Sequence, residues 1–368
     1  MASAVLNEGL TYKELFPLAL HALLKGYSVF IKGKPGCGKS TMARELAAEI
    51  RNIRSKERGR EVNFPYIDLR PSQMEPSELA GLPYPDKDTG RVIQFLPAWF
   101  PSEAAFICIE EFNAAVTKLH QAVMFQLVWD KRIGPHPLPE GSVVLALGNP
   151  EEDNIIVSPI AAPLNNRFVH FTLRPDVDGW LEWAEEQGLP SDYRGYIAFM
   201  RDEALYKNTG EDAFPTPRSN EMAARINGVP DATKKRRLVA GCIGDAYAAK
   251  YMAFIEVYKD INTRTIFEKG EIPQITVRSE PSFLYALMYA SVNYLSGLTP
   301  AKVKGNVAET AVRLLSTYKV HPEYQTTFIK LLVSRKAKML DALRGVPEFK
   351  EIAPKIADLM AAATEPAG

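Results

Sequence analysis

The sequence predicts an α/β fold, in which helices cover both faces of a parallel β-sheet, followed by an all-helical region. Two observations support this prediction. Short apolar segments alternate with helical stretches through the first half of the chain, which is the order that produces a parallel sheet. After about Arg174 no strand pattern recurs, and the remaining segments have helical spacing.

Five segments have the composition of strands of one sheet. They are residues 27–31, 65–69, 105–109, 142–147 and 168–173. The third segment is apolar on both faces, as a buried parallel strand should be. A helix is expected from Thr41 to about Ile53, because its apolar residues recur at every fourth position. We therefore expect a five-stranded parallel sheet.

The second half is expected to consist of helices alone. They are predicted over residues 180–187, 193–205, 219–226, 234–259, 282–295, 307–318, 325–343 and 349–363. This change of character predicts three parts. Residues 1–174 form an α/β core, residues 175–300 a helical lid, and residues 301–368 a C-terminal helical extension.

The composition limits the classes of partner and the cellular location that we expect for this protein. The 368 residues carry a formal net charge of zero, so no overall basic field favours a nucleic acid. The three cysteines, Cys37, Cys108 and Cys242, lack the spacing of a zinc site. The first eight residues do not have the pattern of a signal peptide, and no apolar run approaches the ~20 residues of a membrane span. We expect a soluble cytoplasmic protein without membrane contact.

The strongest motif is Gly33-x-x-x-x-Gly38-Lys39-Ser40, a complete Walker A pattern between a predicted strand and a predicted helix. Glycines allow the backbone amides to curl toward phosphate oxygens. Lys39 is expected to reach the β- and γ-phosphates, and the Ser40 hydroxyl to bind Mg²⁺. The expected ligand is ATP with Mg²⁺. Its predicted binding residues are Gly33, Pro35, Gly36, Cys37, Gly38, Lys39, Ser40 and Thr41.

Two carboxylates, Glu110 and Glu111, directly follow the third predicted strand. A phosphate-loop ATPase needs one acid to order the magnesium shell and another to orient and deprotonate the attacking water. By their order in the sequence, Glu110 is the predicted magnesium residue. Glu111 is the predicted catalytic base.

Three further polar residues are candidates for the same chemistry. Asn149 follows the fourth strand, where its amide would hold the attacking water against the γ-phosphate. Arg167 precedes the fifth strand and is expected at a subunit edge, from which it would reach the γ-phosphate of a neighbouring subunit. Arg218 opens a helix and is expected to fold back onto the phosphates.

Together these residues resemble the AAA+ ATPases, and among them the MoxR-like branch of the helix-2-insert clade. In that comparison residues 106–111 are Walker B, Asn149 is sensor 1, Arg167 is the arginine finger and Arg218 is sensor 2. Residues 81–95 resemble the helix-2 insert hairpin, and residues 133–139 resemble the hairpin before sensor 1. The resemblance covers roughly residues 10–300. It implies an αβα sandwich followed by a helical lid.

The resemblance also implies a function. Such proteins form hexameric rings that use ATP hydrolysis to remodel or activate a protein client, commonly with a partner that carries a von Willebrand factor A domain. This chain departs from the family at two positions. Glu110 stands where an aspartate is usual, which implies slower hydrolysis, and Ala114 follows Asn113 where a basic residue is frequent.

Other functions remain open at this point. One is a nucleic-acid-dependent AAA+ motor, which stimulation of hydrolysis by DNA would favour. Another is a monomeric phosphate-loop kinase for a small molecule. A third, a transcriptional activator ATPase, would carry a Gly-Ala-Phe-Thr-Gly-Ala loop that this sequence lacks.

Overall fold

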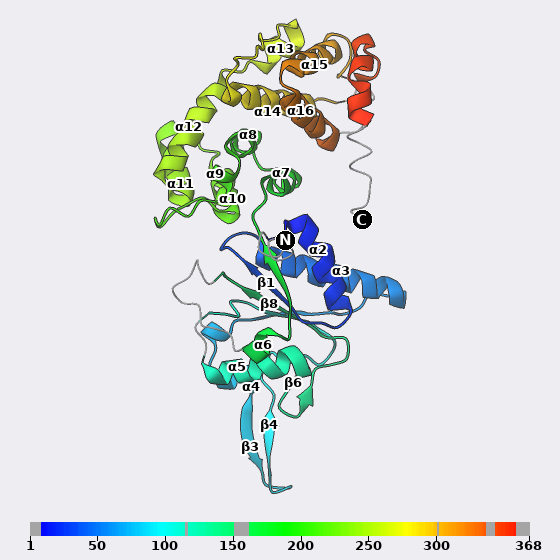
Figure 1. Cartoon of the computed structure of the whole chain (residues 1–368), viewed down its shortest axis with the longest axis vertical. Coiled ribbons are helices and arrows are strands. Elements are labelled where there is room, and N and C mark those ends of the chain that lie inside the picture. Colours follow the sequence, from blue (N-terminus) through cyan, green and yellow to red (C-terminus); the bar gives the residue numbers. More distant parts are fainter. Residues whose placement is uncertain (1–8, 115–116, 151–161, 300–301, 336–342, 358–368) are drawn as a thin grey trace. The chain divides into compact units, whose positions relative to one another are not determined.

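The structure is a computed structural model that describes residues 9–114, 117–150, 162–299, 302–335 and 343–357. The chain forms two compact units (Figure 1). The first comprises Met1–Gly179 with Thr216–Arg218, and the second comprises Trp180–Pro215 with Ser219–Gly368. The sheet belongs to the first unit, and the second unit is helical.

The first unit is built on five parallel strands in the order β2-β5-β8-β1-β9. The strands are β1 (Val29–Gly33), β2 (Tyr66–Leu69), β5 (Phe106–Ile109), β8 (Val143–Gly148) and β9 (Val169–Leu173). Every residue of β5 and β8 is buried, as their apolar sequences require for strands covered on both faces. The predicted α/β fold with a five-stranded parallel sheet is confirmed.

Helices lie on both faces of the sheet (Figure 1), and each face has its own hydrophobic core. Alternate strand residues supply the two cores, because successive side chains of a strand point to opposite faces. Leu145 and Leu147 of β8 pack with the helices α2 (Tyr12–Leu24) and α3 (Lys39–Arg58). The other face is covered by α4 (Pro76–Ala80), α5 (Lys118–Phe125) and α6 (Ala162–Asn165), and η1 (Pro71–Gln73) precedes α4 in the sequence.

Two small hairpins extend the helical face that carries α4 and α5. The strands β3 (Leu82–Asp86) and β4 (Arg91–Phe95) form an antiparallel hairpin that projects from this face (Figure 1). The second hairpin pairs β6 (Arg132–Ile133) with β7 (His136–Pro137). The His136 Nε2 atom lies 3.1 Å from the Gln94 carbonyl oxygen, so the two hairpins meet.

The second unit consists of helices around a shared core. They are α7 (Val177–Glu186), α8 (Ser191–Met200), α9 (Asp202–Leu205), α10 (Pro217–Ile226), α11 (Ala232–Ile243), α12 (Asp245–Lys259), α13 (Thr263–Lys269), α14 (Pro281–Gly297), α15 (Asn306–Thr317), η4 (Tyr318–Val320), α16 (Pro322–Arg335) and η5 (Pro347–Glu351). The first three residues of α7 and the first two of α10 belong to the first unit. One core contains Leu287 of α14 and Leu315 of α15. Residues of the predicted lid and of the predicted extension therefore pack together.

Two of the predicted helices are interrupted. The helix expected over residues 234–259 is two helices, α11 and α12, separated by Gly244 with φ 85°. A Cβ atom at Gly244 would lie 2.8 Å from the Ala213 carbonyl oxygen, so only glycine fits this break. The helix expected over 193–205 ends at Arg201, which has φ 53°. The helices expected over 325–343 and 349–363 extend outside the described residues.

Two features bear on the expected environment of the chain. None of the helices in the described ranges combines the length and the apolar character needed to cross a membrane. Cys37, Cys108 and Cys242 are all buried, and each is a free thiol.

A π-helical turn, η2 (Gln126–Asp130), extends α5 and ends at Lys131, which has φ 51°. The Lys131 ammonium donates a hydrogen bond to the Ser28 hydroxyl, which itself donates to the Val128 carbonyl at 2.7 Å. Burial lowers the pKa of Lys131 to about 8, because the charged form loses its hydration. The charged form of Lys131 is therefore less stable in the folded chain than in the unfolded chain, although the amine is still mostly protonated at pH 7.

The Lys131→Met variant is expected to raise the melting temperature by about 2–4 °C at pH 7, because it removes a buried charge while keeping an aliphatic chain of similar length. Between about pH 8 and 10.5 the unfolded chain holds the proton more tightly than the folded chain, so the wild type gains stability as pH rises. Scanning calorimetry should show the difference shrinking by pH 10. An equal difference at both pH values would contradict this account.

Candidate nucleotide-binding site

The sheet topology brings three of the predicted segments to one edge. The glycine loop follows β1, the acidic pair follows β5, and Asn149 follows β8. Strand β8 lies between β5 and β1, and all three strands run parallel, so their carboxyl ends lie side by side. This is the edge at which open α/β sheets bind ligands.

The glycine loop has the backbone that its sequence requires. Gly36 has φ 73° and Gly38 has φ 99°, conformations that residues with side chains rarely adopt. Helix α3 begins at Lys39, directly after Gly38, and places Ser40 and Thr41 in its first turn. Gly33 ends β1, and Pro35 is exposed in the turn between. The positive end of the α3 dipole therefore adjoins the loop, which suits a phosphate.

Lys39 and Asn149, which are 110 residues apart in the sequence, are in contact. The Lys39 ammonium donates to the Asn149 Oδ1 atom at 3.0 Å and to the Lys34 carbonyl at 3.0 Å. It also donates to the Gly33 carbonyl. Lys39 is the cation expected to bind phosphate, and Asn149 is the amide expected to hold the attacking water. The two side chains are therefore direct neighbours at the sheet edge.

Asn113 fixes the backbone of Asn149, a role that the sequence alone does not reveal. Its side-chain amide donates to the Asn149 carbonyl at 2.7 Å, and its Oδ1 accepts from the Asn149 amide at 3.1 Å. Gly148 allows this approach, because a Cβ there would lie 2.5 Å from Asn113 Oδ1. No sequence signal identifies such a pair, since its members follow different strands.

The two carboxylates differ in environment. Glu110 is buried at the end of β5, and its side chain has no hydrogen bond or ion pair among the described residues. Glu111 is exposed, has φ 51°, and accepts a hydrogen bond from the Ser72 hydroxyl at 3.0 Å. A positive φ at a residue with a side chain is strained, so the fold imposes this turn.

These residues fit a magnesium ion bound mainly through phosphates. Across the part of the chain that the structure describes, no three His, Cys, Asp or Glu side chains form a metal cluster. Mg²⁺ on a nucleotide needs only one or two protein oxygens, since phosphates and water supply the others. The buried, unpaired carboxylate of Glu110 and the hydroxyl of Ser40 are oxygen ligands of that kind.

The segment Thr216–Arg218 belongs to the first unit and contacts the glycine loop. The Arg218 amide donates to the Gly36 carbonyl at 3.2 Å. A Cβ at Gly36 would lie 2.8 Å from Thr216 Oγ1, so glycine is needed here for a second reason. Arg218 is therefore beside the loop at the start of α10, as is Thr216, which no sequence motif marks.

Cys37 lies in the middle of the loop with its side chain buried. Burial raises the pKa of its thiol, although the nearby Lys39 lowers it in part. The thiol is therefore protonated at neutral pH and is a poor nucleophile.

Arg167 is not brought to the glycine loop of its own chain. It precedes β9, whose first residue, Val169, pairs with Val29 at the start of β1. The loop follows the opposite end of β1, and a five-residue strand is about 16 Å long. Arg167 thus lies at the amino-terminal edge of the sheet.

Two aromatic rings hold the Arg167 side chain. Its guanidinium carbon lies 3.7 Å from the centre of the Phe125 ring and 4.9 Å from that of Trp129. Trp129 is in the π-helical turn η2 and is 56% exposed. These cation–π contacts restrict the arginine while leaving it near the surface.

Comparisons with known proteins identify no family for this chain. No family model and no curated protein matches the sequence. Among solved structures, a proposed ATPase from Cytophaga hutchinsonii matches with a TM-score of 0.35 and 16% identity, over 71% of this chain and 89% of that one. NtrX from Brucella abortus matches with a TM-score of 0.34 and 11% identity, over 92% of this chain and 68% of that one.

Proposed function

We propose that this chain is an AAA+ ATPase, similar to the MoxR-like branch, that works as a ring and couples ATP hydrolysis to remodelling or activation of a partner protein. The observation that carries the proposal is the contact between Lys39 and Asn149 at the sheet edge where Glu110 and Glu111 also lie. This combination supplies phosphate binding, magnesium binding, a base and a water-holding amide.

The position of Arg167 supports a ring rather than a monomer. It lies at the opposite edge of the sheet from its own glycine loop, so any γ-phosphate that it contacts belongs to another copy of the chain. A hexamer is the expected ring. A partner with a von Willebrand factor A domain and a cytoplasmic location remain parts of this proposal.

The function is tested by measuring magnesium-dependent ATP hydrolysis together with the molar mass by light scattering, with and without ATP. We expect turnover that chelation of Mg²⁺ abolishes and a closed oligomer that ATP stabilises. A strictly monomeric protein that hydrolyses ATP would refute the ring. A rate that rises severalfold with DNA and falls steeply with salt would favour a nucleic-acid motor.

The Lys39→Ala variant is expected to weaken ATP binding by about 100-fold, because it removes the charged donor to the phosphates. Isothermal titration with ATP and Mg²⁺ measures the loss. Lys34→Ala is the matched control, since it removes an exposed lysine from the same loop. ATP binding by Lys39→Ala that equals the wild type would place the nucleotide elsewhere.

The Trp129→Ala variant is expected to lower kcat for ATP about tenfold and to leave KM unchanged, because it frees Arg167 without touching the glycine loop. Trp129→Phe should restore most of the rate, since a flat ring is retained. Tyr27→Ala is the control, because it removes another exposed aromatic side chain from the first unit. Equal rates for Trp129→Ala and the wild type would show that the stacking does not position Arg167.

A further inference from the structure

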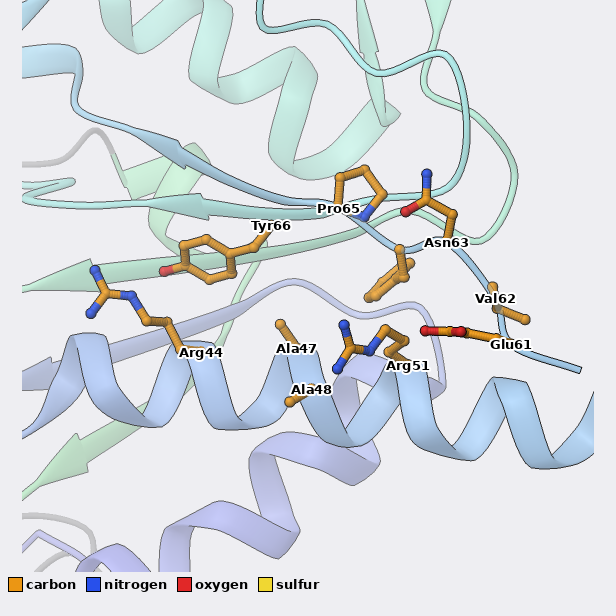
Figure 2. Close-up of a pocket in the computed structure, with 10 residues that line it drawn as sticks. Arg44, Ala47, Ala48, Arg51, Glu61, Val62, Asn63, Pro65 and Tyr66 are labelled. Atoms are coloured by element: carbon orange, nitrogen blue, oxygen red, sulfur yellow. The ribbon is translucent and has the colours of Figure 1, made fainter. Parts of the chain in front are cut away.

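A cavity of about 600 Å³ opens between α3 and the segment that leads into β2 (Figure 2). Arg44, Ala47, Ala48 and Arg51 of α3 form one wall, and Phe64 and Tyr66 belong to the other. The volume is in the range of ligand sites. No residue of the glycine loop lines it, so it is separate from the nucleotide site.

The cavity carries two unpaired cations. Arg44 and Arg51 are two helical turns apart, so they extend from the same side of α3 (Figure 2). The rise along the helix axis between their Cα positions is about 10 Å. Within the described residues neither guanidinium has a hydrogen bond or an ion pair. Arg54 differs, because it stacks on Phe64 and donates to the Gly141 carbonyl at 2.7 Å. Glu61 lines the cavity but does not pair with either arginine.

The same place has an open sheet edge. Among the described residues strand β2 pairs with β5 alone, and the carbonyls of Pro65 and Leu69 accept from the amides of Phe106 and Glu110. The alternation of a parallel ladder therefore turns the amide and carbonyl groups of Tyr66 and Asp68 outward. Such an edge can accept another strand through its backbone groups.

We propose that an extended acidic segment of a partner protein docks in this cavity. Its backbone would pair with the outward groups of Tyr66 and Asp68. Its carboxylates would lie over Arg44 and Arg51. In an added strand every second side chain points to one face, so alternating acidic residues would present their carboxylates to the α3 side. The guanidinium fork suits carboxylates because it donates two parallel hydrogen bonds.

The test uses the full chain and a labelled probe peptide with blocked ends in which eight residues alternate between valine and glutamate. Fluorescence anisotropy should show saturable binding that the combined Arg44→Gln and Arg51→Gln variant weakens about tenfold. Arg58→Gln is the control, since Arg58 is exposed on α3 outside the cavity. Undiminished binding by the double variant, or an equal loss with Arg58→Gln, would overturn the proposal.

Two further probes separate strand addition from simple charge attraction. The first probe is a pair of peptides, one N-methylated at the odd-numbered residues and the other at the even-numbered residues. Only one of these sets of amides faces β2 in an added strand, so one peptide should bind and the other should not. If both bind as the unmodified peptide does, no strand is added. The second probe is millimolar inorganic phosphate, which should leave most of the peptide bound. Complete displacement would identify a small-anion site instead of a peptide site.

Discussion

The Arg167→Ala variant is expected to lower the rate of ATP hydrolysis about 10³-fold, because an arginine that stabilises the transferring phosphoryl group contributes 10³–10⁵ in known NTPases. ATP binding should remain within about twofold of the wild type, since Arg167 lies at the edge of the sheet opposite its own glycine loop. Steady-state turnover and ATP titration measure the two quantities. Arg132→Ala is the control, because it removes an exposed arginine without touching the aromatic stack.

A mixing experiment decides whether Arg167 acts on a neighbouring subunit. Arg167→Ala subunits keep an intact glycine loop, and Lys39→Ala subunits keep an intact arginine. In a ring assembled from equal amounts, about a quarter of the interfaces should combine the intact halves and regain activity. Two variants that remain inactive when mixed, although mixed rings form, would show that Arg167 does not act between subunits.

The strands were predictable because each is an apolar segment in a fixed alternation with helices. Segment 105–109 is apolar on both faces and becomes β5, which is fully buried. The breaks at Gly244 and Arg201 were not predicted, because helical spacing continues across them. At Gly244 a residue far along the chain sets the conformation that breaks the helix. For Gly244 the deciding neighbour is the Ala213 carbonyl oxygen.

The positions of candidate-site residues were predictable where a motif or a strand end marks them. Lys39 and Asn149 each follow a strand of a predicted parallel sheet, and the carboxyl ends of parallel strands lie at the same edge. The structure brings the two side chains into contact there. The residues that contact Asn149 and Arg167 could not be predicted from the sequence. Asn113 meets Asn149 across two strands, and Trp129 reaches Arg167 from a π-helical turn for which the sequence has no signature. Such contacts depend on tertiary structure.

The Glu111→Gln variant is expected to bind ATP with unchanged affinity and to hydrolyse it about 10²–10⁴ times more slowly, because the general base is lost. Its positive φ and its hydrogen bond from Ser72 fix the carboxylate at the turn after β5. Glutamine has nearly the same shape as glutamate, and its side-chain oxygen can still accept the hydrogen bond from the Ser72 hydroxyl. The fall in the hydrolysis rate therefore measures the contribution of the basic carboxylate alone. Single-turnover hydrolysis of bound ATP measures it.

Glu110→Gln should fail differently, because Glu110 is buried and has no partner among the described residues. We expect about tenfold more Mg²⁺ to be needed for half-maximal hydrolysis, while Glu111→Gln leaves the Mg²⁺ requirement unchanged. A Mg²⁺ titration of both variants therefore assigns the two carboxylates. If Glu111→Gln turned over normally and Glu110→Gln did not, their roles would be exchanged. Glu110→Asp shortens the side chain but keeps its charge, so a faster rate in this variant would show that Glu110 slows hydrolysis through its length.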